Sequence, residues 1–118
     1  MSRTELVRRL ILNAICDDYE NVDQVILREV AETASKCGLT IGRSEVVDTL
    51  AGLVEDGMAK AYDLSSREPF CMELSGMPPL DSIEEDFKTY FYITKCGMDF
   101  HRSDDSWFPC EGKDEADR

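Results

Sequence analysis

Basic residues and histidine are scarce in this chain. It has 13 Lys and Arg against 25 Asp and Glu, for a net charge of −12, and it has one histidine. The acidic excess is greater in the second half of the sequence. Such a balance keeps a protein soluble and repels nucleic-acid phosphates and anionic membranes. It therefore disfavours DNA and membrane surfaces as partners.

Long apolar runs are missing as well. No apolar stretch approaches the roughly 18 residues that a membrane-spanning helix needs. Charges at Glu5, Arg8 and Arg9 interrupt the N-terminal segment, so it does not resemble a secretory signal. We therefore expect a cytoplasmic protein with no membrane partner. A length of 118 residues, 42% of them hydrophobic, predicts one globular domain with its own core.

Catalytic and metal-binding motifs are also missing. The five cysteines are far apart and form no CxxC pair, which predicts reduced thiols used as small apolar side chains. Cys96, His101 and Cys110 do not have zinc-site spacing, and Cys96 with His101 lacks a third orienting group for catalysis. The acidic run 84–86 is typical of a solvated loop rather than a cation site. No phosphate-binding glycine loop occurs. We expect no enzyme activity, no cofactor and no metal.

Apolar periodicity predicts two helices in the first third of the chain. Apolar residues recur every three to four positions over about 4–16, with Arg8 and Arg9 on the opposite face. A second stripe ends at Gly38, which suits the left-handed position after a helix. Asn21 can cap this second helix, which begins between positions 23 and 27. Residues 25–27 also fit a short strand, and we prefer the helix.

A third helix is predicted over about 42–56. Leu50 and Leu53 lie on its apolar stripe with Val46, and Gly57 follows its end. Alternation of apolar and polar residues then predicts strands at about 59–64, 70–74 and 87–93, with a loop at 75–86. Thr94 can cap a short helix that ends near position 101.

Two short motifs in this region resemble those of the winged-helix superfamily, in particular bacterial winged helix-turn-helix transcriptional regulators. One motif is the "leucine-threonine, two residues, glycine" that closes the wing strand, matched here by residues 93–97. The other is a leucine-rich helix end that runs into a glycine and an apolar residue: Leu50, Leu53, Val54, Gly57 and Met58.

The resemblance implies an α+β winged-helix fold with a three-helix body, an enlarged β-wing at about 58–94 and a short C-terminal helix. The domain would cover residues 1–102. Residues 103–118 would form an acidic tail, which we expect to be partly disordered because it contains few apolar residues. In this family the third helix enters the DNA major groove and the wing contacts the flanking backbone.

The third helix of this chain departs from that pattern. Arg43 alone among the groove-facing positions could contact a phosphate or a guanine edge, and carboxylates in that place would repel phosphates. The wing is longer than a simple hairpin by roughly twenty residues. We therefore predict that this helix face contacts another protein through six residues: Arg43, Ser44, Glu45, Asp48, Thr49 and Glu55.

Two function hypotheses follow. The first is a non-enzymatic protein-interaction or regulatory module, with Trp107 and Phe108 as an anchor for a partner or a homodimer mate, or docked on the domain itself. The second is a transcriptional regulator that binds DNA by a dimer or another basic face: Arg3, Arg8, Arg9, Arg28, Lys36 and Arg43. The aromatic run 90–92 has no interleaved basic residues, which favours a strand with core and surface sides over base stacking.

Overall fold

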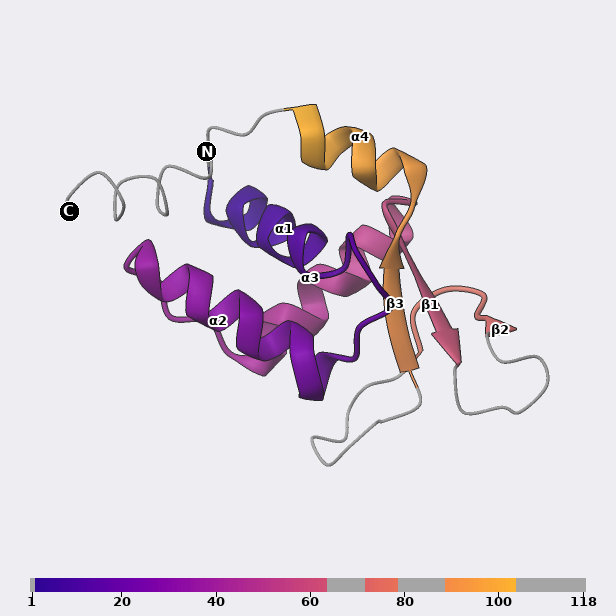
Figure 1. Ribbon diagram of the computed structural model, residues 1–118, viewed down its shortest axis with the longest axis horizontal. Helices are drawn as coiled ribbons and strands as arrows, with labels where there is room; N and C mark the ends of the chain where they lie inside the picture. The colour runs from indigo at the N-terminus through magenta and orange to yellow at the C-terminus, as the bar shows by residue number, and fades with distance from the viewer. Residues whose placement is uncertain (1, 64–71, 79–88, 104–118) are drawn as a thin grey trace.

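The computed structural model describes residues 2–63, 72–78 and 89–103. Within these ranges the chain forms four α-helices, one π-helical segment and a small antiparallel sheet (Figure 1). The α+β class predicted from the sequence is therefore confirmed. The run 84–86, Trp107, Phe108 and most of the predicted tail lie outside the described residues, and the predicted domain boundary at 102/103 stays a prediction.

Helix α1 (Arg3–Ala14) begins where the Ser2 hydroxyl accepts a hydrogen bond from the Glu5 backbone N–H at 3.1 Å. This bond satisfies one of the donors that every helix start leaves open. Val7, Ile11 and Leu12 are fully buried, so α1 lies at the centre of the core. The helix predicted over 4–16 is confirmed, with its C-terminal end two residues earlier.

A π-helical segment, η1 (Val22–Ile26), runs directly into α2 (Leu27–Lys36). The Asn21 side chain accepts hydrogen bonds from the Asp23 and Gln24 backbone N–H groups at 2.9 and 3.3 Å, which confirms Asn21 as the cap. The strand alternative at 25–27 is wrong, because residues 25 and 26 lie in η1 and residue 27 begins α2. After α2, Gly38 has φ +78°, a conformation that side chains disfavour.

Helix α3 (Arg43–Glu55) places Val46, Leu50 and Leu53 in the core with no exposed surface, as the periodicity predicts. Gly57 follows with φ +78° and turns the chain into the sheet. The burial of three apolar side chains along one stripe fixes the helix against α1 and leaves its other side toward solvent.

The sheet has the order β2-β1-β3, and both pairs are antiparallel. Its strands are β1 (Ala59–Asp63), β2 (Met72–Glu73) and β3 (Thr89–Ile93). On the other edge of β3, Glu20 and Phe91 exchange two backbone hydrogen bonds at 3.0 and 2.9 Å. The segment between α1 and η1 therefore adds a one-residue bridge to the sheet. The predicted strands are confirmed over their described parts.

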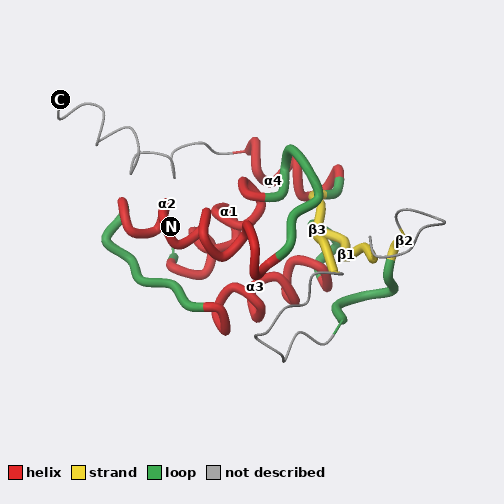
Figure 2. Tube along the Cα trace, turned by 60° about the horizontal axis from the view of Figure 1, so that its bottom comes forward, coloured by secondary structure: helices red, strands yellow, loops and turns green. Residues whose placement is uncertain are grey.

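Helix α4 (Lys95–Ser103) leaves the sheet and returns across α1 (Figure 2). The Thr94 hydroxyl accepts from the Gly97 backbone N–H at 3.0 Å and donates to the Gly57 carbonyl at 2.6 Å. This confirms Thr94 as the cap and ties α4 to the turn after α3. Gly97 is buried against this turn, because an added Cβ would lie 2.0 Å from the Met58 carbonyl oxygen.

Two expectations are corrected by the fold. Arg9, placed on the polar face of the first helix, is only 3% exposed because α4 covers it. The prediction of five reduced cysteines holds for Cys16 and Cys96, whose thiols are free, and is wrong for Cys37, which is disulfide-bonded. Spacing along the chain does not determine which thiols meet in space.

Candidate functional site

The six residues of the predicted interaction face all belong to α3, but they do not all face solvent. Ser44, Asp48 and Glu55 are exposed and lie on the side opposite the core stripe. Arg43, Glu45 and Thr49 are half-buried at the edges of the helix. The solvent-facing part of α3 therefore presents a hydroxyl and two carboxylates.

Arg43, the residue predicted to be able to reach a phosphate, is held inside the protein by Asp23. The Arg43 Nε lies 2.6 Å from one carboxylate oxygen of Asp23, and its Nη2 lies 3.2 Å from the other. The two side chains are only 14% and 13% exposed. A two-point guanidinium–carboxylate pair of this kind is strong and directional, so Arg43 serves to join the start of η1 to the start of α3.

The edge of α3 that faces α1 contains two further ion pairs. Arg3 binds both carboxylate oxygens of Glu45 at 2.9 Å and also donates to the Thr40 carbonyl at 2.7 Å. The hydrogen bond from Arg3 holds the pKa of Glu45 below its ordinary value. Arg8 pairs with the Asp56 carboxylate through its Nη2 atom. The acids of this edge are therefore matched by bases of α1.

The alternative basic face is not assembled in the described part of the chain. Four of its six members are held by carboxylates: Arg3, Arg8, Arg9 and Arg43. The remaining two, Arg28 and Lys36, are exposed on α2 and eight positions apart. Two separate cations do not make the contiguous positive surface that phosphate binding requires.

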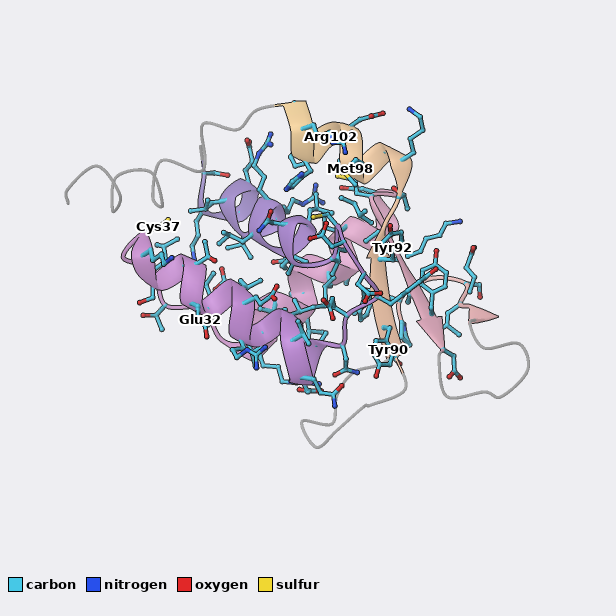
Figure 3. The ribbon with its side chains drawn as sticks, in the orientation of Figure 1. Glu32, Cys37, Tyr90, Tyr92, Met98 and Arg102 are labelled. Atoms are coloured by element: carbon cyan, nitrogen blue, oxygen red, sulfur yellow. The ribbon has the colours of Figure 1, made fainter. Side chains whose placement is uncertain are left out.

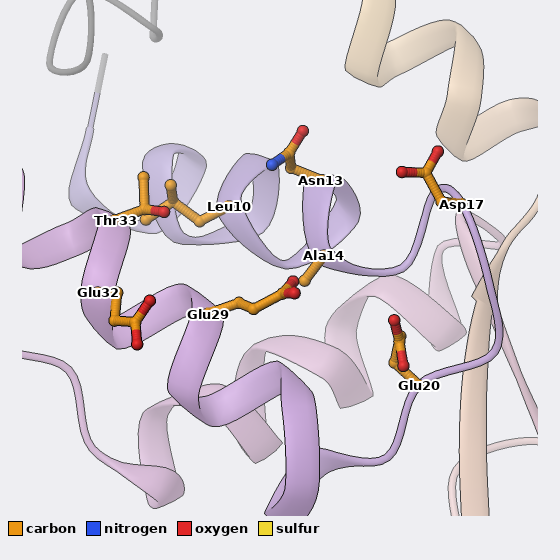
Figure 4. A pocket seen from close by; sticks show the side chains of 8 residues that line it. All are labelled: Leu10, Asn13, Ala14, Asp17, Glu20, Glu29, Glu32 and Thr33. Atoms are coloured by element: carbon orange, nitrogen blue, oxygen red, sulfur yellow. The ribbon is translucent and has the colours of Figure 1, made fainter.

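An acidic cavity of about 330 Å³ lies between α1, α2 and the segment that connects them (Figure 4). Asp17, Glu20, Glu29 and Glu32 line it, and Glu29 extends from α2 toward Ala14 of α1. Burial raises the pKa of Glu20, and the charge of Glu29 raises it further. No sequence motif predicts this cavity, although the spacing of Glu29 and Glu32 places both on one side of a helix.

This cavity does not have the donor set of a metal centre. In the ranges 2–63, 72–78 and 89–103, no group of three or more His, Cys, Asp or Glu side chains is arranged to hold a metal ion. His101 Nε2 lies 3.2 Å from the amide oxygen of Asn13, one of the residues that line the cavity. The cavity is therefore a concentration of negative charge without a ligand geometry of its own.

All four tyrosines of the chain come together on the outer side of the sheet. The Tyr19 ring lies 5.0 Å from that of Tyr62, edge to face, and 4.9 Å from that of Tyr92, tilted by 31°. Tyr90 lies opposite Tyr62 in the register of β1 and β3. Figure 3 shows Tyr90 and Tyr92 along β3. Phe91 between them is fully buried, which confirms the predicted core and surface sides of residues 90–92.

Comparison of the chain with protein-family models, curated proteins and solved structures gave no match. Within the residues that the structure describes, no helix has the length and apolar character to cross a bilayer.

Proposed function

We propose that this chain is a non-enzymatic winged-helix domain that binds another protein, with the exposed acidic side of α3 as part of the contact. The element order supports a winged helix: three helices are followed by an antiparallel sheet. The bridge between Glu20 and Phe91 adds a short pairing before α2. The two antiparallel strands β1 and β3 then correspond to the base of a wing.

One observation carries the proposal: the cations next to α3 are bound by the protein's own carboxylates. Asp23 holds Arg43, Glu45 holds Arg3, and Asp56 holds Arg8. The exposed side chains of α3 itself are Ser44, Asp48 and Glu55, and the exposed Asp56 follows the helix. A helix with this surface complements a basic protein surface and repels a DNA groove.

The repulsion between the α3 carboxylates and DNA phosphates is large enough to favour a protein partner over DNA. Two like charges about 4 Å apart cost about 1 kcal/mol even at the dielectric constant of water, and more at a protein surface. Non-specific DNA binding at physiological salt is worth only about 5–8 kcal/mol. Asp48 and Glu55 placed against phosphates would offset a substantial part of this, and no freed cation on α3 would compensate.

Charge reversal on α3 tests the proposal. The change uses Asp48→Lys with Glu55→Lys, because both side chains are exposed, whereas Glu45 holds Arg3 and its loss would disturb the fold. Binding of a fluorescent random-sequence duplex at low salt is followed by anisotropy. We expect no binding by the unmodified chain and measurable binding by the double variant.

A matched control has the same net charge as the α3 variant, with the added lysines at other positions. Glu32→Lys with Asp99→Lys adds the same charge at exposed positions of α2 and α4. This control should gain much less DNA affinity than the α3 variant. If the unmodified chain binds the duplex and the α3 variant binds it more weakly, the carboxylates read bases and the protein-binding proposal fails.

A further inference from the structure

The outer side of the sheet presents a second surface, separate from the exposed side of α3. We define the tyrosine face as Tyr19, Tyr62, Tyr90 and Tyr92. Strand alternation explains its composition, because Ala59, Ala61, Phe91 and Ile93 point into the core and their neighbours point outward. Each of the four tyrosines is half-buried, so each ring keeps part of its surface toward solvent.

The rings of this face are already ordered. Tyr19 contacts both Tyr62 and Tyr92, with ring centroids 4.9–5.0 Å apart, and the backbone of β1 and β3 is fixed by the ladder. Tyrosine offers a large contact area with few rotatable bonds, so a partner that binds here pays little for ordering side chains. Tyrosine is also among the residues that dominate protein–protein binding energy.

Among the described residues, the charges beside the face favour a cationic partner. Lys60 lies opposite Tyr92 and Glu73 opposite Tyr62, and the two form a pair at 3.0 Å whose charges cancel. The exposed carboxylate of Asp18, which precedes Tyr19, is not part of such a pair. Ring faces beside carboxylates attract a cation, and arginine can stack on a ring while it donates to a carboxylate.

The protein already makes this type of contact in its interior. The guanidinium of Arg9 lies 4.1 Å from the centre of the Phe100 ring, and its Nε lies 3.3 Å from a carboxylate oxygen of Glu5. The tyrosine face offers the same two partners, an aromatic ring and a carboxylate, to a guanidinium from another molecule.

We propose that the tyrosine face docks an arginine-bearing segment of another protein, with guanidinium groups stacked on the rings and Asp18 as an acceptor at the rim. This inference rests on the proposed function as a protein-binding domain. It adds a second contact surface and a partner that carries arginine. Single-stranded nucleic acid, which also stacks on aromatic residues, is disfavoured because its phosphates would meet a protein of net charge −12.

The test is an NMR titration of the full isotopically labelled chain at low salt. The probe is a capped peptide of alternating arginine and glycine, and the control peptide replaces arginine by citrulline, which has nearly the same shape and no charge. The arginine peptide should shift the signals of Tyr62, Tyr90 and Tyr92 in a saturable way. The citrulline peptide should not.

Two variants separate stacking from other contributions. Tyr90→Leu with Tyr92→Leu should weaken peptide binding about tenfold, since each exposed cation–π contact gives a few-fold gain in affinity. Tyr90→Phe with Tyr92→Phe keeps both rings and should bind within about twofold of the unmodified chain. The amide spectrum of each variant shows whether the sheet is retained, and the phenylalanine variant keeps the test valid if leucine disturbs the fold.

The outcomes distinguish this inference from the proposed function. If the arginine peptide binds but shifts α3 or the acidic cavity, the tyrosine face is the wrong surface and the protein-binding role stands. If oligothymidine and not the peptide shifts the tyrosines, the inference about an arginine-bearing partner fails, and the α3 proposal is decided by its own charge-reversal test. Absence of any shift at low salt overturns the tyrosine face. Sedimentation that shows a dimer, with these rings protected until dilution, overturns it too because a second copy is then the occupant.

Discussion

Replacement of Arg9 by methionine should destabilise the protein far more than the same change at the neighbouring Arg8. Arg9 is 3% exposed and joins α1 to α4. Its guanidinium donates to the Phe100 carbonyl at 3.0 Å and to the Ser103 hydroxyl at 3.5 Å, stacks on the Phe100 ring and pairs with Glu5. Methionine keeps the apolar stem and removes these contacts.

The expected cost follows from these contacts. Hydrogen bonds to a buried charge contribute about 1.5–3 kcal/mol, and a cation–π contact contributes about 0.5–2 kcal/mol. Release of a buried charge offsets part of this. We expect a net loss of about 2–3 kcal/mol in the free energy of unfolding for Arg9→Met. Arg8 and Asp56 are 22% and 48% exposed, and an exposed pair contributes about 0–1 kcal/mol.

Thermal and urea unfolding followed by circular dichroism would measure both variants. At about 4 °C per kcal/mol for a chain of this size, Arg9→Met should lower Tm by about 8–12 °C, and Arg8→Met by less than about 4 °C. Amide exchange should also accelerate in α4 of the Arg9 variant, because α4 loses the Arg9 contacts to Phe100 and Ser103. Equal losses for the two variants would refute the role assigned to Arg9.

Three further predictions concern the core, a close contact and pH. Leu50→Ala should cost about 2–5 kcal/mol in a urea titration, since Leu50 is fully buried; an unchanged midpoint would contradict its placement. Gly97→Ala should lower Tm, whereas Gly52→Ala inside α3 should not, because there an added Cβ meets only the flexible end of Arg8 at 3.3 Å. Burial, then the charges of Arg9 and Arg102, lower the pKa of His101. The native state therefore binds fewer protons, and stability is lost as pH falls below about 6.5. His101→Gln should show a smaller drop in Tm between about pH 7.5 and 5.5 than the unmodified chain.

The helices and strands were predictable because their signals are local. A period of three to four residues placed Leu50 and Leu53 in the core, and capping chemistry placed Asn21 and Thr94 at helix starts. Strand alternation likewise separated Phe91 from its tyrosine neighbours.

The ion pairs were not predictable because they join distant positions. Arg43 and Asp23 are 20 residues apart, and Arg3 and Glu45 are 42 apart. A sequence pattern shows that Arg43 is the basic residue on its helix face, but not that a carboxylate from η1 already holds it. Arg9 was misplaced for the same reason, since the periodicity of one helix does not show that α4 will cover its polar side.

The central claim is that the arginines beside α3 are paired with carboxylates of the same chain and do not bind DNA. The most direct measurement records the Nε–H signals of Arg3, Arg8 and Arg43 by NMR while a DNA duplex is added at low salt, where phosphate attraction is strongest. The account predicts that these three signals, and the amides of Ser44 and Asp48, do not move. A saturable shift of the arginine signals together with those α3 amides would contradict it.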